Sequence, residues 1–421
     1  MAKVFSDRVT VSIDVGTTKI CVLVAQQLDG DNIEILGVGK SPSEGLKKGV
    51  VVDVAKTIHS VNLAVKEAEL MAGFSIESAC VGISGGHIQS LTSQGMAPIK
   101  RGEVRVGDIQ AALASAQAIP IPEGMQVLHV LPQYFVIDSH TRVNDPLGMH
   151  GIRLEVQAHI ILGAVASVQN LVKCVEMAGV KVTDIILEQL ASADAVLSPD
   201  ERMLGVAVLD IGGGTSDLAI YQQDSIRHTM VLPVAGNHFT NDVAIGLRTT
   251  LQEAERVKKE FGYAMIELID EDMLFEVSSV HSSASNAKVK EGAQKNVVQQ
   301  TELISILNPR AREILILVHQ EIAKRHLQPF MATGLVLTGG GALLRGMTDL
   351  AQTIFSCPVR VGNPRLTHDM PESLDSPIFA TGYGLVLHVI KKSQRSGLDT
   401  MSGPLVNRLF SRMKSWVADF F

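Results

Sequence analysis

The chain has 421 residues, with 46% hydrophobic residues, 19% charged residues and a formal net charge of −7. This length is too great for one simple core and predicts two to four lobes, while the low charged content argues against extended disorder. The negative balance argues against general nucleic-acid binding, which usually requires a basic surface.

Strand-like and helix-like patterns alternate through residues 1–86. Strands are predicted at residues 9–15, 20–25, 33–39 and 78–84. A helix is predicted at residues 53–71, where apolar side chains recur at helical spacing. This alternation predicts a lobe in which helices cover a sheet.

The pattern changes between residues 87 and 164. A short Ala-rich helix is predicted at residues 107–118, and strands are predicted at residues 126–138 and 152–162. A polar loop containing Asn144, Asp145 and Pro146 joins these two strands. These features predict a small α/β subdomain inserted into the first lobe.

The α/β pattern returns after this insertion. The predicted elements are a helix at 166–178, a strand at 182–187, a helix at 189–197, two helices within 240–262, a long helix at 302–325, a strand at 334–337 and a last helix at 378–390. Residues 278–300 are rich in small and polar side chains and are predicted to be a mobile surface segment. Residues 391–403 are polar without apolar periodicity, which predicts a flexible linker.

Two glycine-containing turns, far apart in the chain, each follow an apolar strand that ends in Asp. The first contains Asp14, Gly16, Thr17 and Thr18, and the second contains Asp210, Gly212, Gly213, Gly214 and Thr215. Such a hairpin presents backbone N–H groups to phosphate oxygens, and its Asp can hold Mg²⁺ through water. One such turn is typical of an ordinary hairpin, but two indicate a duplicated α/β domain that grips one polyphosphate from both sides. Lys19 follows the first turn and either reaches a β- or γ-phosphate or lies on an exposed hairpin edge.

Three further segments complete a five-part pattern. Residues 188–192 begin a helix after a strand, residues 338–342 form a Gly-rich turn after a strand, and residues 378–384 begin the last helix. In this order, the five segments resemble the nucleotide-binding pattern of the actin, Hsp70 and sugar-kinase superfamily. The resemblance implies an α/β, two-lobed, actin-like ATPase fold with duplicated sheet-plus-helix lobes and with ATP and Mg²⁺ bound between them.

The superfamily resemblance also implies roles for individual residues. Asp14 and Asp210 would lie beside the hydrated Mg²⁺, and Gly339, Gly340 and Gly341 would lie at the adenine end. The phosphates would contact Gly16, Thr17, Thr18, Lys19, Gly212, Gly213, Gly214 and Thr215. Glu255 and Lys258 fit a ribose contact, although a solvated helical pair is an equal alternative. Glu188 stands where relatives carry a water-orienting residue, but Gln189 replaces the proline that is common after it, so ATP hydrolysis is expected to be slow or absent.

The last eighteen residues have the pattern of an amphipathic helix behind a helix-starting Pro404. Its apolar face contains Leu405, Leu409, Phe410, Met413, Trp416, Val417, Phe420 and Phe421, and its polar face contains Arg408, Arg412 and Lys414. Aromatic and basic residues on opposite faces predict a helix that lies in the headgroup region of an anionic membrane. The alternatives are a terminal helix docked on the protein's own core and a dimer contact. No apolar stretch reaches the ~20 residues of a spanning helix and no signal peptide is recognised, so a cytoplasmic location is expected.

A nucleotide-binding core with such a tail is similar to the FtsA family of bacterial cell-division proteins. The likeness includes the segments 127–134 and 227–229 as well as the two turns and the tail. It implies an actin-like polymer on the cytoplasmic face of the inner membrane that tethers FtsZ, and thus the Z ring, and recruits later division proteins. The FtsZ C-terminal tail would dock on residues 232–325, where Arg310 or Arg312 could pair with its acidic residues, unless each is a solvated helix-face charge.

The family resemblance implies six structural units. The first lobe is expected at 1–86, 165–198 and 366–390, the insertion at 87–164, the second lobe at 199–231 and 326–365, its outer subdomain at 232–325, the linker at 391–403 and the membrane helix at 404–421. A type IV pilus inner-membrane assembly protein of the same subfold is the nearest alternative, but such proteins generally lack an amphipathic tail. A sugar kinase would not use that tail, and an Hsp70 would need a further domain.

Overall fold

The protein is described by a computed structural model that covers residues 9–28, 32–139, 142–279, 295–365 and 371–399. The predicted membrane helix at 404–421 lies outside these residues. Within the part that is described, no helix is both long and apolar enough to cross a bilayer.

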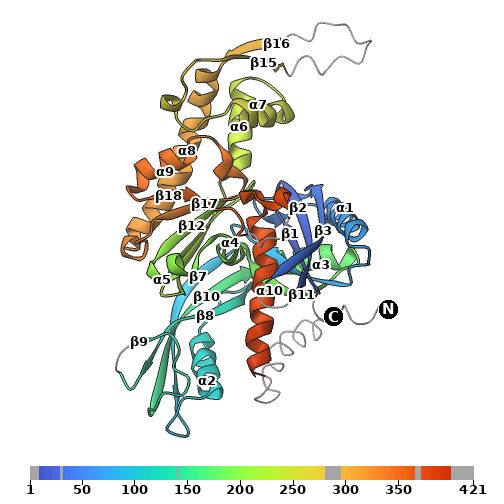
Figure 1. Cartoon of the computed structure of the whole chain (residues 1–421). Helices are drawn as coiled ribbons and strands as arrows, with labels where there is room; N and C mark the ends of the chain where they lie inside the picture. Colours follow the sequence, from blue (N-terminus) through green and yellow to red (C-terminus); the bar gives the residue numbers. More distant parts are fainter. Residues whose placement is uncertain (1–8, 29–31, 140–141, 280–294, 366–370, 400–421) are drawn as a thin grey trace.

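Two five-stranded sheets of identical topology form the centre of the molecule (Figure 1). The first has the order β11-β6-β1-β2-β3 and the second the order β18-β17-β12-β13-β14. In each sheet, the first two strands form a long antiparallel hairpin. The second strand of the hairpin pairs antiparallel with the third strand, and the first strand pairs parallel with a later one. The first sheet comprises β1 (Val9–Val15), β2 (Lys19–Gln27), β3 (Ile33–Pro42), β6 (Ser78–Ile83) and β11 (Lys181–Leu187); the second comprises β12 (Val206–Ile211), β13 (Ser216–Gln222), β14 (Ser225–Leu232), β17 (Leu335–Thr338) and β18 (Val359–Val361). The duplicated lobes predicted from the two turns are therefore confirmed.

The order of the helices along the chain is duplicated in the same way as the order of the strands. Corresponding positions along the chain are occupied by α1 (Val54–Ala72), α3 (Val165–Met177) and α4 (Glu188–Val196) in the first half, and by α8 (Gln300–Lys324), α9 (Met347–Phe355) and α10 (Ala380–Asp399) in the second. Asp53 caps the start of α1 by accepting from the Lys56 N–H, and Gly73 ends it in the left-handed conformation. Helices α4 and α10 pack against each other between the two sheets, and this contact joins the two lobes.

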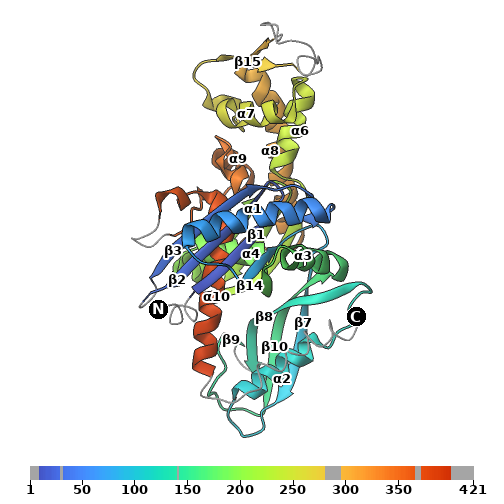
Figure 2. The same ribbon diagram turned by 90° about the vertical axis from the view of Figure 1, so that its right-hand side faces the viewer.

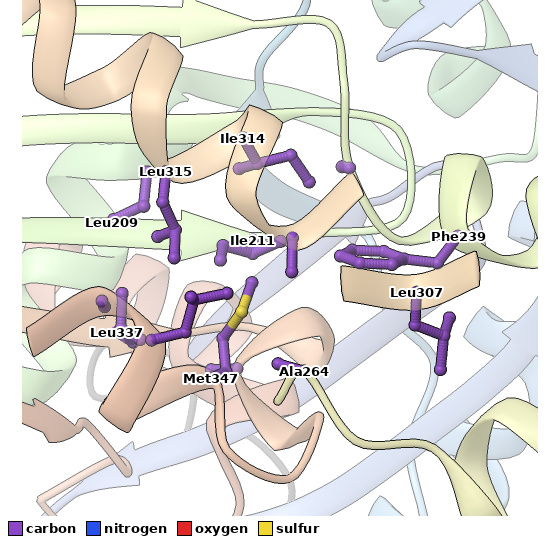
Figure 3. Close-up of a cluster of buried hydrophobic side chains, with 14 of the residues drawn as sticks. Leu209, Ile211, Phe239, Ala264, Leu307, Ile314, Leu315, Leu337 and Met347 are labelled. Carbon is purple, nitrogen blue, oxygen red and sulfur yellow. The ribbon is translucent and has the colours of Figure 1, made fainter. Parts of the chain in front are cut away.

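Buried aliphatic side chains hold α8 and α9 on the second sheet. Leu209, Ile211 and Leu337 of the sheet meet Leu315 of α8 and Met347 of α9 in one cluster (Figure 3). Burial of this kind stabilises the fold by about 25 cal/mol per Å² of apolar surface removed from water. Phe239 belongs to the same cluster and also lines the cavity between the lobes, so the core directly supports the cavity wall.

The insertion predicted at residues 87–164 is a separate sheet covered by one helix. Its strands are β7 (Gln89–Pro98), β8 (Met125–Ile137), β9 (Arg142–Val143) and β10 (Arg153–Ala164), in the order β7-β10-β8-β9, and its helix is α2 (Val106–Gln117). Buried alanines of α2 lie close to the sheet, and a Cβ on Gly95 would come within 2.2 Å of the Ala112 carbonyl oxygen. Strand β7 has few apolar residues, which is why its sequence does not predict it.

The outer subdomain of the second lobe lies at the opposite end of the molecule from the insertion (Figures 1 and 2). It contains α6 (Gly236–Gly246), α7 (Leu251–Phe261), β15 (Leu274–Ser278), β16 (Lys295–Gln299) and part of α8. The prediction of a mobile segment is wrong at residues 295–299, because these pair with β15. Residues 280–294 lie outside the described residues. The smaller elements are β4 (Leu46–Lys47), β5 (Val50–Val51), α5 (Pro199–Leu204), η2 (Ile266–Leu268), η4 (Gln328–Phe330), η5 (Gly340–Leu343), η6 (Glu372–Leu374) and η7 (Pro377–Phe379).

The predicted linker at 391–403 is wrong for most of its length, because α10 continues to Asp399. Ion pairs that sequence periodicity does not reveal hold this extension. The Lys391 Nζ lies 2.7 Å from Asp194 Oδ1, and Lys392 pairs with Asp184 of β11. Residues 400–403 lie outside the described part of the chain.

Candidate functional site

A cavity of about 600 Å³ lies between the two lobes. The turns of the β1–β2 and β12–β13 hairpins, the start of α4, the helix α7 and the glycines before and within η5 line it. All fifteen residues predicted to contact the nucleotide, and Glu188, are among its lining residues. The fold therefore brings together side chains that are more than three hundred positions apart in the sequence.

The two Gly-containing turns come into contact with each other in the wall of the cavity. A Cβ on Gly213 would come within 1.7 Å of Thr18 Oγ1, and a Cβ on Gly214 would come within 2.3 Å of Thr17 Oγ1. The Thr17 hydroxyl accepts from the Gly49 N–H at 3.1 Å, which orders the first turn. Only glycine permits this approach, and the resulting pair of turns offers backbone N–H groups to an anion from both lobes.

Four carboxyl groups line the cavity: Asp14, Asp210 and Asp217 are buried, and Glu188 is partly buried. Burial raises the pKa of Asp14 to about 6 and that of Asp217 to about 7. Burial, together with Asp14, Asp217 and Asp210, also raises the pKa of Glu188 well above its usual value. Several carboxylates with little access to water are unfavourable as unpaired anions, so a bound cation or protonation must neutralise part of their charge.

Asp210 is the best anchored of these carboxylates. Its Oδ2 accepts from Ser192 Oγ at 2.5 Å and from Thr381 Oγ1 at 3.0 Å, so the helices α4 and α10 both hold it. Burial raises the pKa of Asp210, while these two hydroxyl donors oppose the rise. An immobilised carboxylate next to a phosphate cradle is suited to orient the water shell of Mg²⁺.

Asp217 is a site residue that sequence reasoning missed. It lies directly across the hairpin from Asp210 in the strand register, and accepts from Ser84 Oγ at 2.6 Å and Thr215 Oγ1 at 2.9 Å. The signal was available in the sequence, because the residue that pairs with Asp210 in a tight hairpin projects on the same face.

Lys19 lies in the cavity wall rather than on a free hairpin edge. Its Nζ donates to the Ile378 carbonyl and lies 4.3 Å from the centre of the Phe379 ring. Its charge opposes the burial-driven rise in the pKa of Asp14 and of Asp210. An ammonium group so placed can turn toward a phosphate that enters between the two turns.

Glu255 and Lys258 of α7 line the cavity. They form an ion pair at 2.6 Å, and Lys258 also donates to Thr240 Oγ1 at 2.9 Å. The pairing holds the pKa of Glu255 below its usual value despite burial, so it stays an acceptor for hydroxyl groups. Gly339, beside Asp210 in the cavity wall, adopts φ 78° and ψ 172°, a conformation open essentially only to glycine.

The two arginines predicted for partner contact differ in their surroundings. Arg310 of α8 pairs with Asp242 of α6 at 2.7 Å and also with Glu313. Arg312 is exposed. The structure thus places Arg312, and not Arg310, in a position open to a partner.

The residues that line the cavity fit the Mg²⁺-bound nucleotide that the five-part sequence pattern implies. Among the described residues, no three metal-ligating side chains converge closely enough to enclose an ion directly. Asp14 and Asp210 instead face a roomy cradle, which suits an ion that keeps its water shell and is shared with a polyphosphate. When bound, such an ion would neutralise the carboxylates and polarise the phosphate oxygens.

The comparisons with known proteins agree with this architecture. Residues 207–384 match the family of cell division protein FtsA, and residues 85–162 match the SHS2 domain inserted in FtsA. Over the full length of both chains, the protein is 40% identical to cell division protein FtsA of Pseudomonas aeruginosa and 34% identical to that of Escherichia coli. It is 37% identical to that of Bacillus subtilis over 92% of this chain and 84% of that one.

Solved structures of other proteins share the fold at low identity. A PilM–PilN type IV pilus biogenesis complex aligns with a TM-score of 0.62 and 17% identity, over 90% of this chain and 98% of that one. MreB5 of Spiroplasma citri bound to ADP aligns with a TM-score of 0.55 and 16% identity, over 94% of this chain and 99% of that one. The fold is therefore actin-like, with an SHS2 subdomain inserted in the first lobe. With full-length relatives at this level of identity, the chain belongs to the FtsA family of cell division proteins.

Proposed function

We propose that this protein binds Mg²⁺·ATP between its lobes and polymerises on the cytoplasmic face of the cell membrane, where it anchors FtsZ. The observation that carries the nucleotide part is the meeting of two glycine turns and four carboxyl groups, three of them buried, in one cavity. Family membership supports the role in division. Recruitment of later division proteins belongs to the same proposal.

ATP acts here as an assembly ligand. Because the two turns come from different lobes, a polyphosphate held by both favours the closed arrangement over any opened one. Asp14 and Asp210 hold the hydrated Mg²⁺, Lys19 compensates phosphate charge, and Glu255 with Lys258 contacts the ribose. Glu188 orients a water molecule, but burial and the neighbouring carboxylates raise its pKa and so favour its protonated form, which cannot accept a proton from that water, and hydrolysis is therefore slow.

Membrane attachment is proposed for residues 404–421. Full-length protein with ATP is expected to pellet with anionic liposomes, whereas protein ending at Gly403 stays in the supernatant. The basic and aromatic faces of the tail supply the binding energy, with about 1 kcal/mol for each basic residue near the surface. Co-sedimentation measures this directly.

A matched control for the tail is a full-length Trp416→Glu, Phe420→Glu variant, which keeps the length but places charge on the apolar face. It should stay soluble, and neutral liposomes should bind the wild type less than anionic ones. If the protein ending at Gly403 pellets as well as the full chain, the anchor is elsewhere and this part of the proposal is wrong.

The FtsZ tail is proposed to dock on the outer subdomain beside Arg312. The variant Arg312→Glu is expected to weaken binding of an FtsZ C-terminal peptide about tenfold, because it replaces an open cation by an anion. Fluorescence anisotropy with a labelled peptide measures the change. Arg248→Glu, which alters an exposed arginine of the same subdomain, serves as the control and should bind normally. Equal binding by Arg312→Glu and wild type would exclude this contact.

A further inference from the structure

A second cavity, of about 410 Å³, lies where the inserted subdomain meets the second lobe. We call it the junction cavity. Its polar lining comes from Thr92, Gln133 and Arg142 of the insertion and from Gln222, Gln223 and Arg227 of the second lobe. It shares no lining residue with the cavity between the lobes. The segments 127–134 and 227–229, which carry part of the family resemblance, meet here and have no role in the nucleotide site.

The backbone around the junction cavity is firmly joined. Gln133 of β8 is buried and donates both to the Ile226 carbonyl at 2.9 Å and to the Arg227 carbonyl at 3.0 Å. Asn144 donates to the Gln223 carbonyl at 2.9 Å. These bonds fix the β13–β14 turn against the insertion and so set the position of Arg227.

The charges in this cavity are unbalanced. Arg142 and Arg227 both line it, and among its described lining residues there is no carboxylate. Arg142 stacks on Tyr134 with 4.3 Å between the guanidinium and the ring centre. Arg227 donates from one terminal nitrogen to Gln223 Oε1 at 3.2 Å, while its Nε is buried without an acceptor among the described residues. Burial, and secondarily the nearby Arg142, lower the pKa of Arg227.

Two guanidinium groups that face one cavity need an anion with more than two oxygens. Each guanidinium can donate a parallel pair of hydrogen bonds, so a carboxylate satisfies only one of them, whereas a phosphate can serve both. A buried N–H without an acceptor costs about 1–3 kcal/mol, so Arg227 is a cation that lacks a full set of partners among the described residues. A cavity of about 410 Å³ also leaves room beyond a phosphate group, beside the rings of Tyr134 and Phe330.

We propose that the junction cavity binds the phosphate group of a small phosphorylated molecule, with Arg142 and Arg227 as its two anchors. The carbon part of the ligand lies against Tyr134 and Phe330. Because Arg142 belongs to the insertion and Arg227 to the second lobe, the bound molecule holds these two parts in one relative orientation. This site is separate from the nucleotide site and goes beyond the function proposed above.

Titration calorimetry of the full chain with phenyl phosphate tests the site. The buffer is free of sulfate, phosphate and nucleotide at constant ionic strength, and the Arg142 and Arg227 variants, which leave the nucleotide cavity unaltered, separate binding at the junction cavity from binding between the lobes. Wild type is expected to bind saturably, Arg142→Gln and Arg227→Gln each at least about tenfold more weakly, and the double variant not at all. Arg345→Gln is the matched control, because Arg345 is also exposed and stacks on a tyrosine, at 5.3 Å from the Tyr263 ring centre. It should bind as wild type does.

Two further ligands define the chemistry. If the site binds a phosphate ester, inorganic phosphate should bind more weakly than phenyl phosphate. Equal affinity for the two would overturn the choice of an ester and would identify free phosphate as the ligand. Acetate should not compete, and competition by acetate would overturn the choice of phosphate over carboxylate. Arg142 is exposed, so Arg142→Gln keeps the fold, and circular dichroism with melting checks this for both variants. Unchanged binding in both variants, or no saturable binding by wild type, would overturn the site itself.

Discussion

Replacing Gly339 with alanine is expected to lower ATP affinity at least about a hundredfold and to destabilise the second lobe by about 3 kcal/mol. Gly339 has φ 78° and ψ 172°, which strains any residue with a side chain. The added Cβ would also come within 2.2 Å of Asp210 Oδ1 and 2.7 Å of the Ile211 carbonyl oxygen. The clash therefore moves the carboxylate that is proposed to orient the hydrated Mg²⁺. Calorimetry with ATP and Mg²⁺ and urea denaturation measure the two effects.

A glycine outside the cavity provides the control. The neighbouring glycine, Gly340, lines the cavity itself, so the matched control is Gly73, which has a similar φ of 79° outside the cavity and where a Cβ would meet nothing within 4 Å; Gly73→Ala should bind ATP as wild type does. If Gly339→Ala kept full ATP affinity, Asp210 would not be part of the nucleotide site. A variant that melts normally but fails to bind ATP would locate the effect in the site and not in folding.

Replacing Asp14 with asparagine is expected to stabilise the ligand-free protein by about 2–3 kcal/mol at pH 8 while greatly weakening Mg²⁺·ATP binding. Burial moves the pKa of Asp14 from 3.8 to about 6, so at pH 8 the folded protein holds a buried charge that the unfolded chain keeps in water. Each pKa unit corresponds to about 1.4 kcal/mol. Asparagine removes this charge with little change of shape, but it also removes a carboxylate proposed to lie beside Mg²⁺.

The sign of the pH dependence follows from the same shift. The contribution of the protonated carboxyl to stability is fully present below the unfolded pKa of 3.8 and is lost as pH rises through about 6. Burial pushes the pKa values of His129, His159 and His228 down, and these histidines act in the opposite direction over part of this range. The difference between Asp14→Asn and wild type isolates Asp14, and should grow from near zero at pH 4 to its full value above pH 7.

Urea denaturation at pH 4, 6 and 8 without nucleotide measures this difference. The exposed Asp270 offers a comparison of the same chemistry, and Asp270→Asn should change neither stability nor ATP binding. Saturating Mg²⁺·ATP should reduce the pH dependence of wild type, because the ion compensates the carboxylates. A stability difference independent of pH would show that charge burial at Asp14 is not its cause.

Sequence patterns alone predicted much of the fold. Apolar runs ending in Asp-containing turns identified both hairpins, and helical periodicity located helices such as α1 and α8 within a few residues. These features are local, because the spacing of the apolar side chains that a strand or helix buries can be read from the sequence of that segment alone. The change of pattern after residue 86 likewise marked the insertion, which is a separate sheet with its own core.

Elements whose stability comes from distant partners were not predicted. Strand β16 forms because β15 pairs with it, and Lys391 and Lys392 of α10 pair with Asp194 and Asp184, which lie about two hundred positions earlier. Neither segment carries an apolar period of its own. Asp217 was missed because its role depends on strand register, and the pairing of Arg310 with Asp242 depends on how α6 packs on α8.

The sequence by itself therefore determined which residues could hold phosphate and metal, because glycine, hydroxyl and carboxylate groups have that chemistry wherever they occur. Only the tertiary structure decided that Thr18 touches Gly213, and that four carboxyl groups share one cavity in which their pKa values rise. It also decided that Arg142 and Arg227 face one cavity. Distance and burial set the strength of electrostatic interactions, and both are properties of the folded chain.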